Sequence, residues 1–427
     1  MPNVTELTRK TLQTGAHPGV RAALWVGFVF YFFYHAARFF GRSWPLKMEK
    51  DAEQIYRLST WIAEHGDYPA RLWLDNLLIV FPYPPPTPLM FAALGAAGPH
   101  CFLAIWITLI AAAFFWSIKV CFLSEPAEIR RGWLLIGMAG LLVAGSAVSW
   151  DLRYGNSNLI WLGAVLLGYA HVRKRPMLAG FCVGVSVALK LYSGLLIGWL
   201  LLYRPKAAVI AIAVTVCLWV LLPVASFGPA GTVKLYDGWL EQLRIVSGYW
   251  VYETVPESGQ VVTTVRRAAI VITGAGPAAA STEWLVRSLF AAWTALILWY
   301  GWRAWRAGTN ATRSRAMLGD WIVLLLFPLP FSPWLEPYHA VPMLPAAVLL
   351  VAVALDQNVS ARGRSVAAFA LAGVSLLRVF FDPILLRGLS MLAQFAFVVA
   401  ALALLRRELV QQTVEPEVSR AAAPVEA

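Results

Sequence analysis

Long uninterrupted apolar stretches constrain the fold of this chain more than any other feature of its sequence. A membrane-spanning helix needs about 20 predominantly apolar residues. Because the stretches lack the polar alternation of β-barrel strands, each is predicted to be a helix. The sequence therefore predicts an all-α, polytopic integral membrane protein with about ten to thirteen transmembrane helices. The candidate spans cover residues 22–40, 101–124, 132–149, 157–172, 206–227, 284–304, 319–334, 338–355, 365–381 and 388–405.

Composition supports this class of protein and excludes two others. Hydrophobic residues make up 59% of the 427 residues and charged residues 14%, whereas soluble domains average about 45–50% and about 25%. An ordinary soluble enzyme and a disordered chain are therefore excluded. The net charge is +12, but the basic residues stand in short clusters between apolar spans. This pattern is typical of the positive-inside bias of membrane proteins rather than of nucleic-acid binding.

The basic clusters predict how the chain is oriented. We expect them on the cytoplasmic side, which places residues 41–77 and 228–283 outside as a first and a long outer loop. The turns Asp151–Asn158 and Ser332–His339 then also lie outside. We expect residues 1–408 to form one membrane domain and 409–427 a disordered cytoplasmic tail. The clusters are Arg9–Lys10, Arg130–Arg131, Arg173–Arg175, Arg204–Lys206, Arg303–Arg315, Arg362–Arg364 and Arg406–Arg407.

Two segments are not simple spans. Lys190 interrupts the apolar run 176–203, and the predicted orientation requires a hairpin or broken helix there, with Lys190 near the outer face. Residues Phe81–Pro86 are too rich in proline for a regular helix. We interpret 78–96 as a partly re-entrant segment, because a full crossing would place Arg130 and Arg131 on the wrong side; a loop at the membrane interface is the alternative.

Common signatures of soluble catalysis are missing from the sequence. It contains no zinc-type His/Cys cluster, P-loop, Gly-x-Gly-x-x-Gly or Gly-x-Ser-x-Gly motif, so nucleotide chemistry on a soluble domain is unsupported. The first apolar run is not followed by a small-residue cleavage site, so we expect a retained helix rather than a signal peptide. Four cysteines lie within apolar spans and are expected to be small buried packing residues: Cys101, Cys121, Cys182 and Cys217.

Polar and ionisable side chains gather at the predicted outer face. Such groups are costly at membrane depth and are the first candidates for function, whereas the inner loops carry mostly arginine and lysine. We therefore expect the chemistry at the outer face. The outer set comprises Asp51, Glu53, Tyr56, Asp67, Tyr68, Asp75, Tyr83, Asp151, Arg153, Asn156, Asn158, Lys190, Arg266, Glu336, Tyr338 and His339.

Three members of this set have a specific chemical interpretation and a plainer alternative. Asp51 could act as a general base toward a hydroxyl, or be a solvated acid on a surface helix. Lys190 could bind a phosphate, or extend its ammonium group to the interface. His339 could hydrogen-bond a phosphate or a sugar hydroxyl, or be structural. Four outer aromatic residues could stack on sugars or belong to an interfacial belt: Tyr68, Tyr83, Trp150 and Tyr154.

In their order along the chain, several short motifs resemble the GT-C superfamily of membrane glycosyltransferases. More closely, the chain is similar to glycosyltransferase family 87, which includes polyprenol-phosphate-mannose-dependent α-(1→2)-mannosyltransferases of actinobacteria. The family's usual Gly-Gln-x-Asn reads Gly155-Asn156-Ser157-Asn158 here. The matching motifs are Asp51…Tyr56, Gly66–Pro69, Phe81–Pro85, Gly155–Asn158, Ala179–Lys190 and Ser332–His339.

The resemblance implies a GT-C-like bundle with catalytic loops at the outer face of the plasma (inner) membrane. It implies transfer of a hexose, with mannose favoured, from a polyprenyl-phosphate donor to a glycolipid or glycan acceptor with inversion. Asp51 would be the base, and Lys190 with Arg266 or His339 would bind the donor phosphate. No cofactor is obligatory, although a divalent ion is an open alternative. Substrate contacts are expected at Tyr56, Tyr83, Arg153, Asn156 and Asn158.

Two other functions compete with the glycosyltransferase interpretation. A transporter or flippase for lipid-linked sugars would also use broken helices and intramembrane charges. However, no inverted repeat is visible, and the polar groups concentrate at the outer face rather than the midplane. A non-catalytic assembly subunit of an envelope polysaccharide system would predict no effect of removing Asp51.

Overall fold

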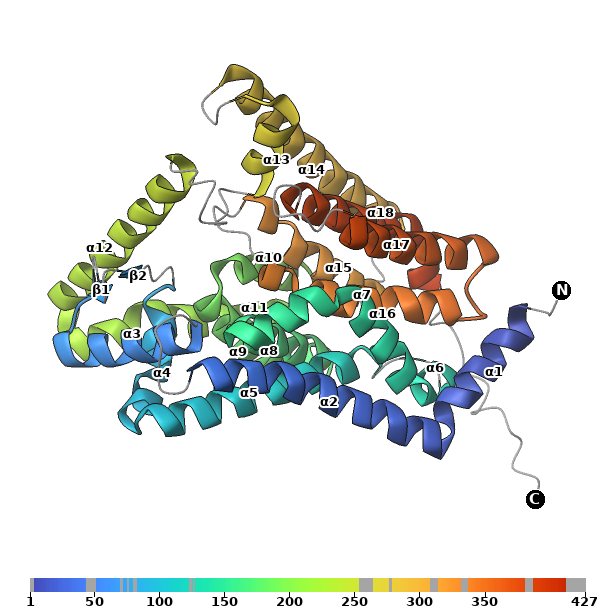
Figure 1. Ribbon diagram of the computed structural model, residues 1–427, viewed down its shortest axis with the longest axis horizontal. Coiled ribbons are helices and arrows are strands. Elements are labelled where there is room, and N and C mark those ends of the chain that lie inside the picture. Colours follow the sequence, from blue (N-terminus) through green and yellow to red (C-terminus); the bar gives the residue numbers. More distant parts are fainter. Residues whose placement is uncertain are drawn as a thin grey trace.

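The structure, a computed structural model, describes residues 4–43, 51–69, 72–74, 77–79, 83–122, 125, 127–252, 264–275, 279–307, 314–331, 337–380 and 387–411. Most of these residues are helical (Figure 1). The helices are α1 (Val4–Ala16), α2 (Pro18–Ser43), α3 (Asp51–His65), α4 (Pro86–Ala96), α5 (Pro99–Val120), α6 (Ala127–Arg131), α7 (Trp133–Tyr154), α8 (Asn158–His171), α9 (Pro176–Leu189), α10 (Gly194–Tyr203), α11 (Pro205–Val216), α12 (Leu222–Tyr252), α13 (Thr264–Thr273), α14 (Ala280–Arg306), α15 (Ser314–Leu326), α16 (Met343–Leu355), α17 (Ala361–Phe380) and α18 (Arg387–Gln411).

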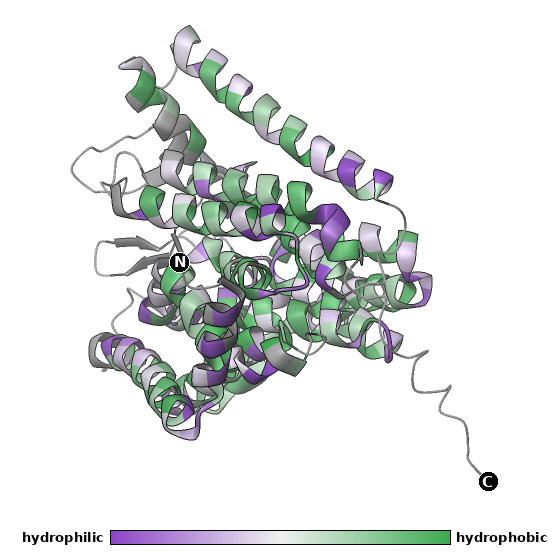
Figure 2. Ribbon diagram, turned by 90° about the vertical axis from the view of Figure 1, so that its right-hand side faces the viewer, coloured by the Kyte–Doolittle hydropathy of each residue, from purple (hydrophilic) through white to green (hydrophobic). Residues whose placement is uncertain are grey.

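Long apolar helices confirm the prediction of a polytopic membrane protein. Among the described residues, six helical segments are long and apolar enough to cross a membrane, and five further apolar helices are shorter. Hydrophobic residues extend along most of the helices in Figure 2. The all-α prediction missed one short antiparallel hairpin, in which β1 (Leu72–Leu74) pairs with β2 (Leu77–Ile79).

Different contacts are found at the two opposite ends of the helical bundle. At one end, Arg315 of α15 binds Glu125, which follows α5, and Asp356, which follows α16. At the opposite end, the 3₁₀ turn η4 (Pro337–Ala340) packs against α7. Figure 1 shows α1 and α6 at the right and α3, β1 and β2 at the left. The basic cluster Arg130–Arg131 of α6 therefore lies far from the predicted outer segments, as the charge pattern requires.

The segment 176–203 is a broken helix, as predicted. Helix α9 ends at Leu189, Lys190 adopts an extended conformation (φ −147°, ψ 111°), and the 3₁₀ turn η1 (Leu191–Ser193) leads into α10. Several other predicted spans are shorter than expected. Helix α8 has 14 residues and α15 has 13, both below the roughly 20 residues that a full crossing needs.

Residues 228–283, expected as a long outer loop, are largely helical where the structure describes them. They include most of α12 and all of α13. Helix α12 bends at Gly228, whose φ of 70° lies in the left-handed region that favours glycine. Pro229 follows this bend and pre-sets the backbone for a new helix. The hydroxyl of Tyr236, after the bend, donates to the carbonyl of Trp219 before it, so the two arms of the bend remain in contact.

Two of the four cysteines contradict the prediction that all are buried packing residues. Cys121 and Cys182 are buried, but Cys101 and Cys217 are exposed. Because both exposed residues lie on apolar helices, their positions are typical of side chains that face lipid. An apolar sequence pattern alone does not separate a lipid-facing position from an interior one, since both favour apolar residues.

The prediction for Arg406 also needs correction. It was expected as a topology signal in an inner loop, but the side chain is only 2% exposed and lies between helices. Its guanidinium donates to Asp320 of α15, at 2.7 and 3.1 Å. The same carboxylate accepts hydrogen bonds from Tyr300 of α14 and Trp199 of α10. Arg406 therefore joins α18 to the rest of the bundle.

Candidate active site

Lys190 lies where the broken helix meets the proline-rich segment. Its ammonium group is 5.4 Å from the centre of the Tyr83 ring, within the range of a cation–π contact. The hydroxyl of Thr87, in the first turn of α4, donates to the carbonyl of Ala188 at 2.9 Å. That carbonyl belongs to the last turn of α9, where backbone acceptors have no helical partner. Two predicted site residues, Lys190 and Tyr83, are thus brought together.

A second set of contacts holds Tyr83 from the other side. The hydroxyl of the buried Tyr68 donates to the carbonyl of Tyr83 at 2.7 Å. Residues 66–69, which follow α3, are in turn held by the second arm of α12. Lys234 binds Asp67 at 2.9 Å, and Gln242 donates to the carbonyl of Pro69 at 2.6 Å. The hydrogen bond from Lys234 lowers the pKa of Asp67.

The turn between α7 and α8 contains a buried polar network. The fully buried carboxylate of Asp151 accepts hydrogen bonds from the side-chain amide of Asn158 at 3.0 Å and from the backbone of Leu159 at 3.2 Å. The same amide donates to Asn156 at 2.7 Å. Gly155 ends α7 with a φ of 60°, which a side chain would strain. Asp151 therefore fixes the predicted residues Asn156 and Asn158 in place.

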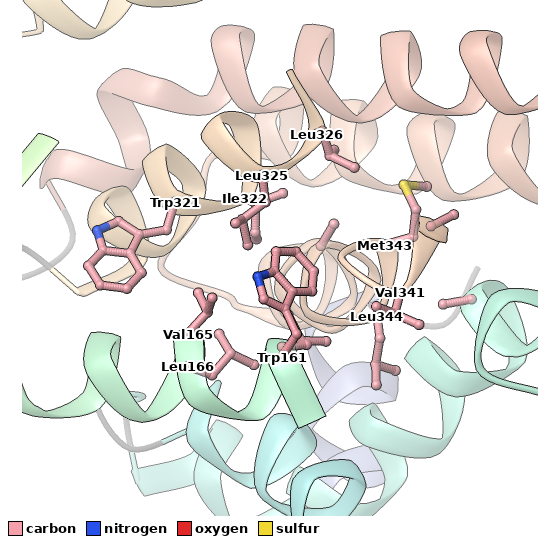
Figure 3. Close-up of a cluster of buried hydrophobic side chains, with 14 of the residues drawn as sticks. Trp161, Val165, Leu166, Trp321, Ile322, Leu325, Leu326, Val341, Met343 and Leu344 are labelled. Atoms are coloured by element: carbon pink, nitrogen blue, oxygen red, sulfur yellow. The ribbon is translucent and has the colours of Figure 1, made fainter. Parts of the chain in front are cut away.

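Trp161 connects this turn to the break at Lys190. Its indole N–H donates to the hydroxyl of Ser193, and its ring meets Tyr192 edge-on with 5.0 Å between centres. Figure 3 shows Trp161 of α8 within a cluster of apolar side chains from α8, α15 and the region where α16 begins. A core residue thus positions η1 against the α7–α8 turn.

His339 lies in η4 beside an aromatic group at the end of α7. The ring of Tyr338 is 4.7 Å from the His339 ring and 6.0 Å from that of Tyr154. Tyr154 stacks on Trp150 at 5.3 Å. Four residues proposed from sequence as outer aromatic or polar candidates therefore meet at the end of the molecule that also carries the α7–α8 turn.

Other predicted residues lie elsewhere in the structure. Arg153 donates to His35 of α2 at 3.3 Å, on the opposite face of α7 from Asp151. Tyr56 contacts the ring of Phe102 at 5.3 Å. Arg266 belongs to α13, which packs on α14 and α18 and lies at the top of Figure 1, away from α9.

Some predictions fall outside what the structure describes. Asp51 is the first residue of α3, but its side chain lies outside the described residues, as does that of Arg266. The same holds for Asp75, Phe81–Pro82 and Ser332–Glu336. Helix α3 packs on α4, so the backbone of Asp51 begins a helix that borders the Tyr83–Lys190 contact. The buried Glu53 of this helix pairs with Arg57 at 3.6 Å.

Sequence reasoning did not single out Thr87, Trp161, Tyr192 or Ser193, which all contribute to this region. The available signal was closeness in sequence: Thr87 follows the proline run, Tyr192 and Ser193 follow Lys190, and Trp161 follows the Gly155–Asn158 motif. Within the described part of the chain, no three His, Cys, Asp or Glu residues are grouped so that they could hold a metal ion.

Two sequence comparisons identify related proteins. The profile of glycosyltransferase family 87 matches residues 81–328. A polyprenol-phosphate-mannose-dependent alpha-(1-2)-phosphatidylinositol mannoside mannosyltransferase from Mycolicibacterium smegmatis is 27% identical over 270 residues, which are 62% of this chain and 56% of that protein. The chain thus spans little more than half the length of this curated relative. No solved structure matches. The family match covers more than half of the chain and includes Tyr83, the α7–α8 turn and Lys190, so the protein belongs to glycosyltransferase family 87.

Proposed function

We propose that this protein is a membrane glycosyltransferase that transfers mannose from a polyprenyl-phosphate donor to a glycolipid or glycan acceptor. The observation that carries the proposal is the fixed position of Lys190 at the break of α9, beside Tyr83. Family membership and the name of the curated relative support the type of reaction and the donor.

Lys190 supplies the positive charge that a phosphate-linked donor requires. An ammonium group is a compact point charge that binds phosphate well. It would stabilise the leaving polyprenyl phosphate, whose negative charge grows as the bond to the sugar breaks. His339 of η4 and Arg266 of α13 are the further candidates for this phosphate, and the polyprenyl chain would lie along the apolar helices.

The reaction proposed for this site is a single displacement. The acceptor hydroxyl attacks the anomeric carbon while Asp51 takes its proton. The new bond joins the acceptor oxygen to the anomeric carbon, and the bond from that carbon to the phosphate oxygen breaks. Attack from the side opposite the phosphate inverts the configuration. Since cationic side chains can neutralise the phosphate, no step requires a metal ion, and activity should survive a chelator.

The remaining predicted residues would contact the substrates. Tyr83 lies beside Lys190 and is therefore placed near the donor, while Asn156 and Asn158 border the same region through the α7–α8 turn. Tyr56 and Arg153 are proposed as further substrate contacts. The relative's name supports a glycolipid acceptor. We propose that the site opens to the outer face of the plasma (inner) membrane, because the basic clusters predict that orientation.

The test uses purified protein in nanodiscs with a panel of radiolabelled polyprenyl-phosphate sugars and a lipid and glycan extract. Transfer from the mannose donor that disappears in Asp51→Asn is the expected result. Equal transfer by the wild type and Asp51→Asn would remove Asp51 as the base. Movement of the labelled donor between leaflets of proteoliposomes, without a covalent product, would instead establish a flippase.

A further inference from the structure

Three polar atoms remain without a hydrogen-bond partner in the interior between the α7–α8 turn and η1. They are the side-chain carbonyl oxygen of Asn158, the hydroxyl oxygen of Ser157 and the hydroxyl oxygen of Tyr192, and none has a partner among the residues that the structure describes. Buried polar atoms are nearly always paired, and each exception calls for an explanation.

The orientation of the Asn158 oxygen is fixed. The amide nitrogen of this side chain donates to Asp151 at 3.0 Å and to Asn156 at 2.7 Å. With both N–H groups engaged, Oδ1 lies on the other edge of the planar amide and points away from Asp151 and Asn156. Because Asn158 is fully buried, this oxygen is a fixed acceptor that the fold itself does not satisfy.

Tyr192 lies in the same interior region as this acceptor. Its ring contacts Trp161 at 5.0 Å, and Trp161 stands three residues after Asn158 on α8, on the same helical face. Asp151, which binds Asn158, is also close enough to Tyr192 to interact with it electrostatically. The Tyr192 side chain is only partly buried, although its hydroxyl oxygen is enclosed.

We propose that Tyr192 and Asn158 bind one hydroxyl group of the transferred sugar. The Tyr192 O–H would donate to the sugar oxygen, and the sugar O–H would donate to Oδ1 of Asn158. This inference rests on the proposed function, which gives the phosphate to Lys190. Tyr192 follows Lys190 by two residues, and in the donor the sugar is bonded directly to the phosphate. A hydroxyl near the phosphate end of the sugar is therefore the group within reach.

Such a pair would act as a determinant of sugar specificity. A donor that lacks the hydroxyl leaves the two buried groups unpaired, which weakens binding more than the loss of a solvated contact does. Ordered water could supply the same O–H chemistry. A water molecule would satisfy both groups whichever sugar is bound. Discrimination between sugars therefore distinguishes a sugar hydroxyl from a water molecule as the partner.

The experiment compares the wild type, Tyr192→Phe and Tyr203→Phe in nanodiscs. Tyr203→Phe is the matched control, because it also removes a tyrosine hydroxyl, but at the far end of α10. The donors are polyprenyl-phosphate mannose and its analogues deoxygenated singly at C2, C3, C4 or C6. We measure kcat/KM for transfer and the thermal stabilisation given by each donor relative to polyprenyl phosphate alone.

We expect the wild type and Tyr203→Phe to discriminate against one deoxy donor by about tenfold. Tyr192→Phe should lose this discrimination while keeping that against the other analogues. Unchanged discrimination, or a uniform loss across all donors, would overturn the inference and leave water as the partner. If the wild type transfers no sugar, the proposed function fails. The thermal measurements then test the inference by themselves. The inference stands only if Tyr192→Phe loses the extra stabilisation given by the sugar and Tyr203→Phe keeps it.

Discussion

Lys190 and Tyr83 are held together from two directions. The ammonium group lies 5.4 Å from the ring centre, Thr87 binds the last turn of the helix that precedes Lys190, and Tyr68 binds the carbonyl of Tyr83. A lysine that only extended its charge to the interface would not need such support. The contact therefore favours a preorganised binding group over the plainer alternative.

Replacing Lys190 by methionine should weaken donor binding. The substitution keeps the length of the side chain and removes the charge, so the phosphate loses a charged hydrogen bond. We expect KM for the polyprenyl-phosphate donor to rise by about ten- to a hundredfold, with a smaller change in Lys190→Arg. Steady-state kinetics with a fixed acceptor would measure this. An unchanged KM in Lys190→Met would show that the phosphate binds elsewhere.

Replacing Gly238 by alanine should disturb the same site from a distance. A Cβ at this position would lie 2.7 Å from the carbonyl oxygen of Tyr68 and 2.9 Å from its Cβ. Helix α12 would have to move away from residues 66–69, at a cost of about 1–3 kcal/mol. We expect a lower unfolding temperature and reduced transfer. Gly198→Ala is the control, because nothing lies within 4 Å of its Cβ; similar losses in both variants would contradict the explanation.

Removing the guanidinium of Arg406 should destabilise the whole bundle. Arg406→Met would leave the buried carboxylate of Asp320 without its cation, which costs about 3–5 kcal/mol. The double variant Arg406→Met, Asp320→Leu should recover much of this loss. Thermal unfolding of the two single variants and the double variant in detergent forms a complete cycle. Additive effects would mean that the pair is not coupled.

The ion pair between Asp67 and Lys234 should contribute a stabilisation that depends on pH. The hydrogen bond from Lys234 lowers the pKa of Asp67 in the folded protein below the ordinary value of 3.8. The stabilisation is therefore complete above that ordinary value and is lost as the pH falls through the lower folded value. Because Lys234 is 67% exposed, we expect no more than about 1 kcal/mol.

The pH dependence of unfolding would be compared between the wild type and Asp67→Asn. Their difference in unfolding temperature should be constant near neutral pH and shrink in strong acid. Lys234→Met should abolish the shrinking, since the cation that lowers the pKa is gone. If the difference in unfolding temperature between the wild type and Asp67→Asn does not change with pH, the ion pair between Asp67 and Lys234 does not stabilise the fold electrostatically.

Local sequence patterns predicted the break at Lys190 and the non-helical entry to α4 at Tyr83–Pro85, because charge and proline act on the backbone where they occur. They did not predict that Lys190 meets Tyr83, which depends on packing between helices far apart in sequence. Arg153 shows the same limit. It lies two residues from Asp151, but the helical rotation between them directs it to His35 instead of the polar turn.

Charged residues near helix ends were the hardest to interpret. Arg406 and Arg130 look alike in the sequence, since both belong to basic pairs beside apolar stretches. Arg130 is exposed, whereas Arg406 is buried against Asp320. The partner lies 86 residues away, so no local pattern separates a topology signal from a buried ion pair. The sequence placed the end of a span at residue 227, next to the bend at Gly228, but missed the helix that follows, because Lys234 and Asp237 interrupt its apolar pattern.

The ion pairs of Arg406 and Arg315 bear on where this protein could be divided. Residues 81–328 carry the family match, yet Asp320 obtains its guanidinium from α18 and Arg315 binds Asp356 beyond α16. A fragment cut at the limits of the match would leave the buried Asp320 without its cation and remove one of the two carboxylates that bind Arg315. The region that matches the family is therefore not an independent folding unit, and any shortened version of the chain must retain its last helices.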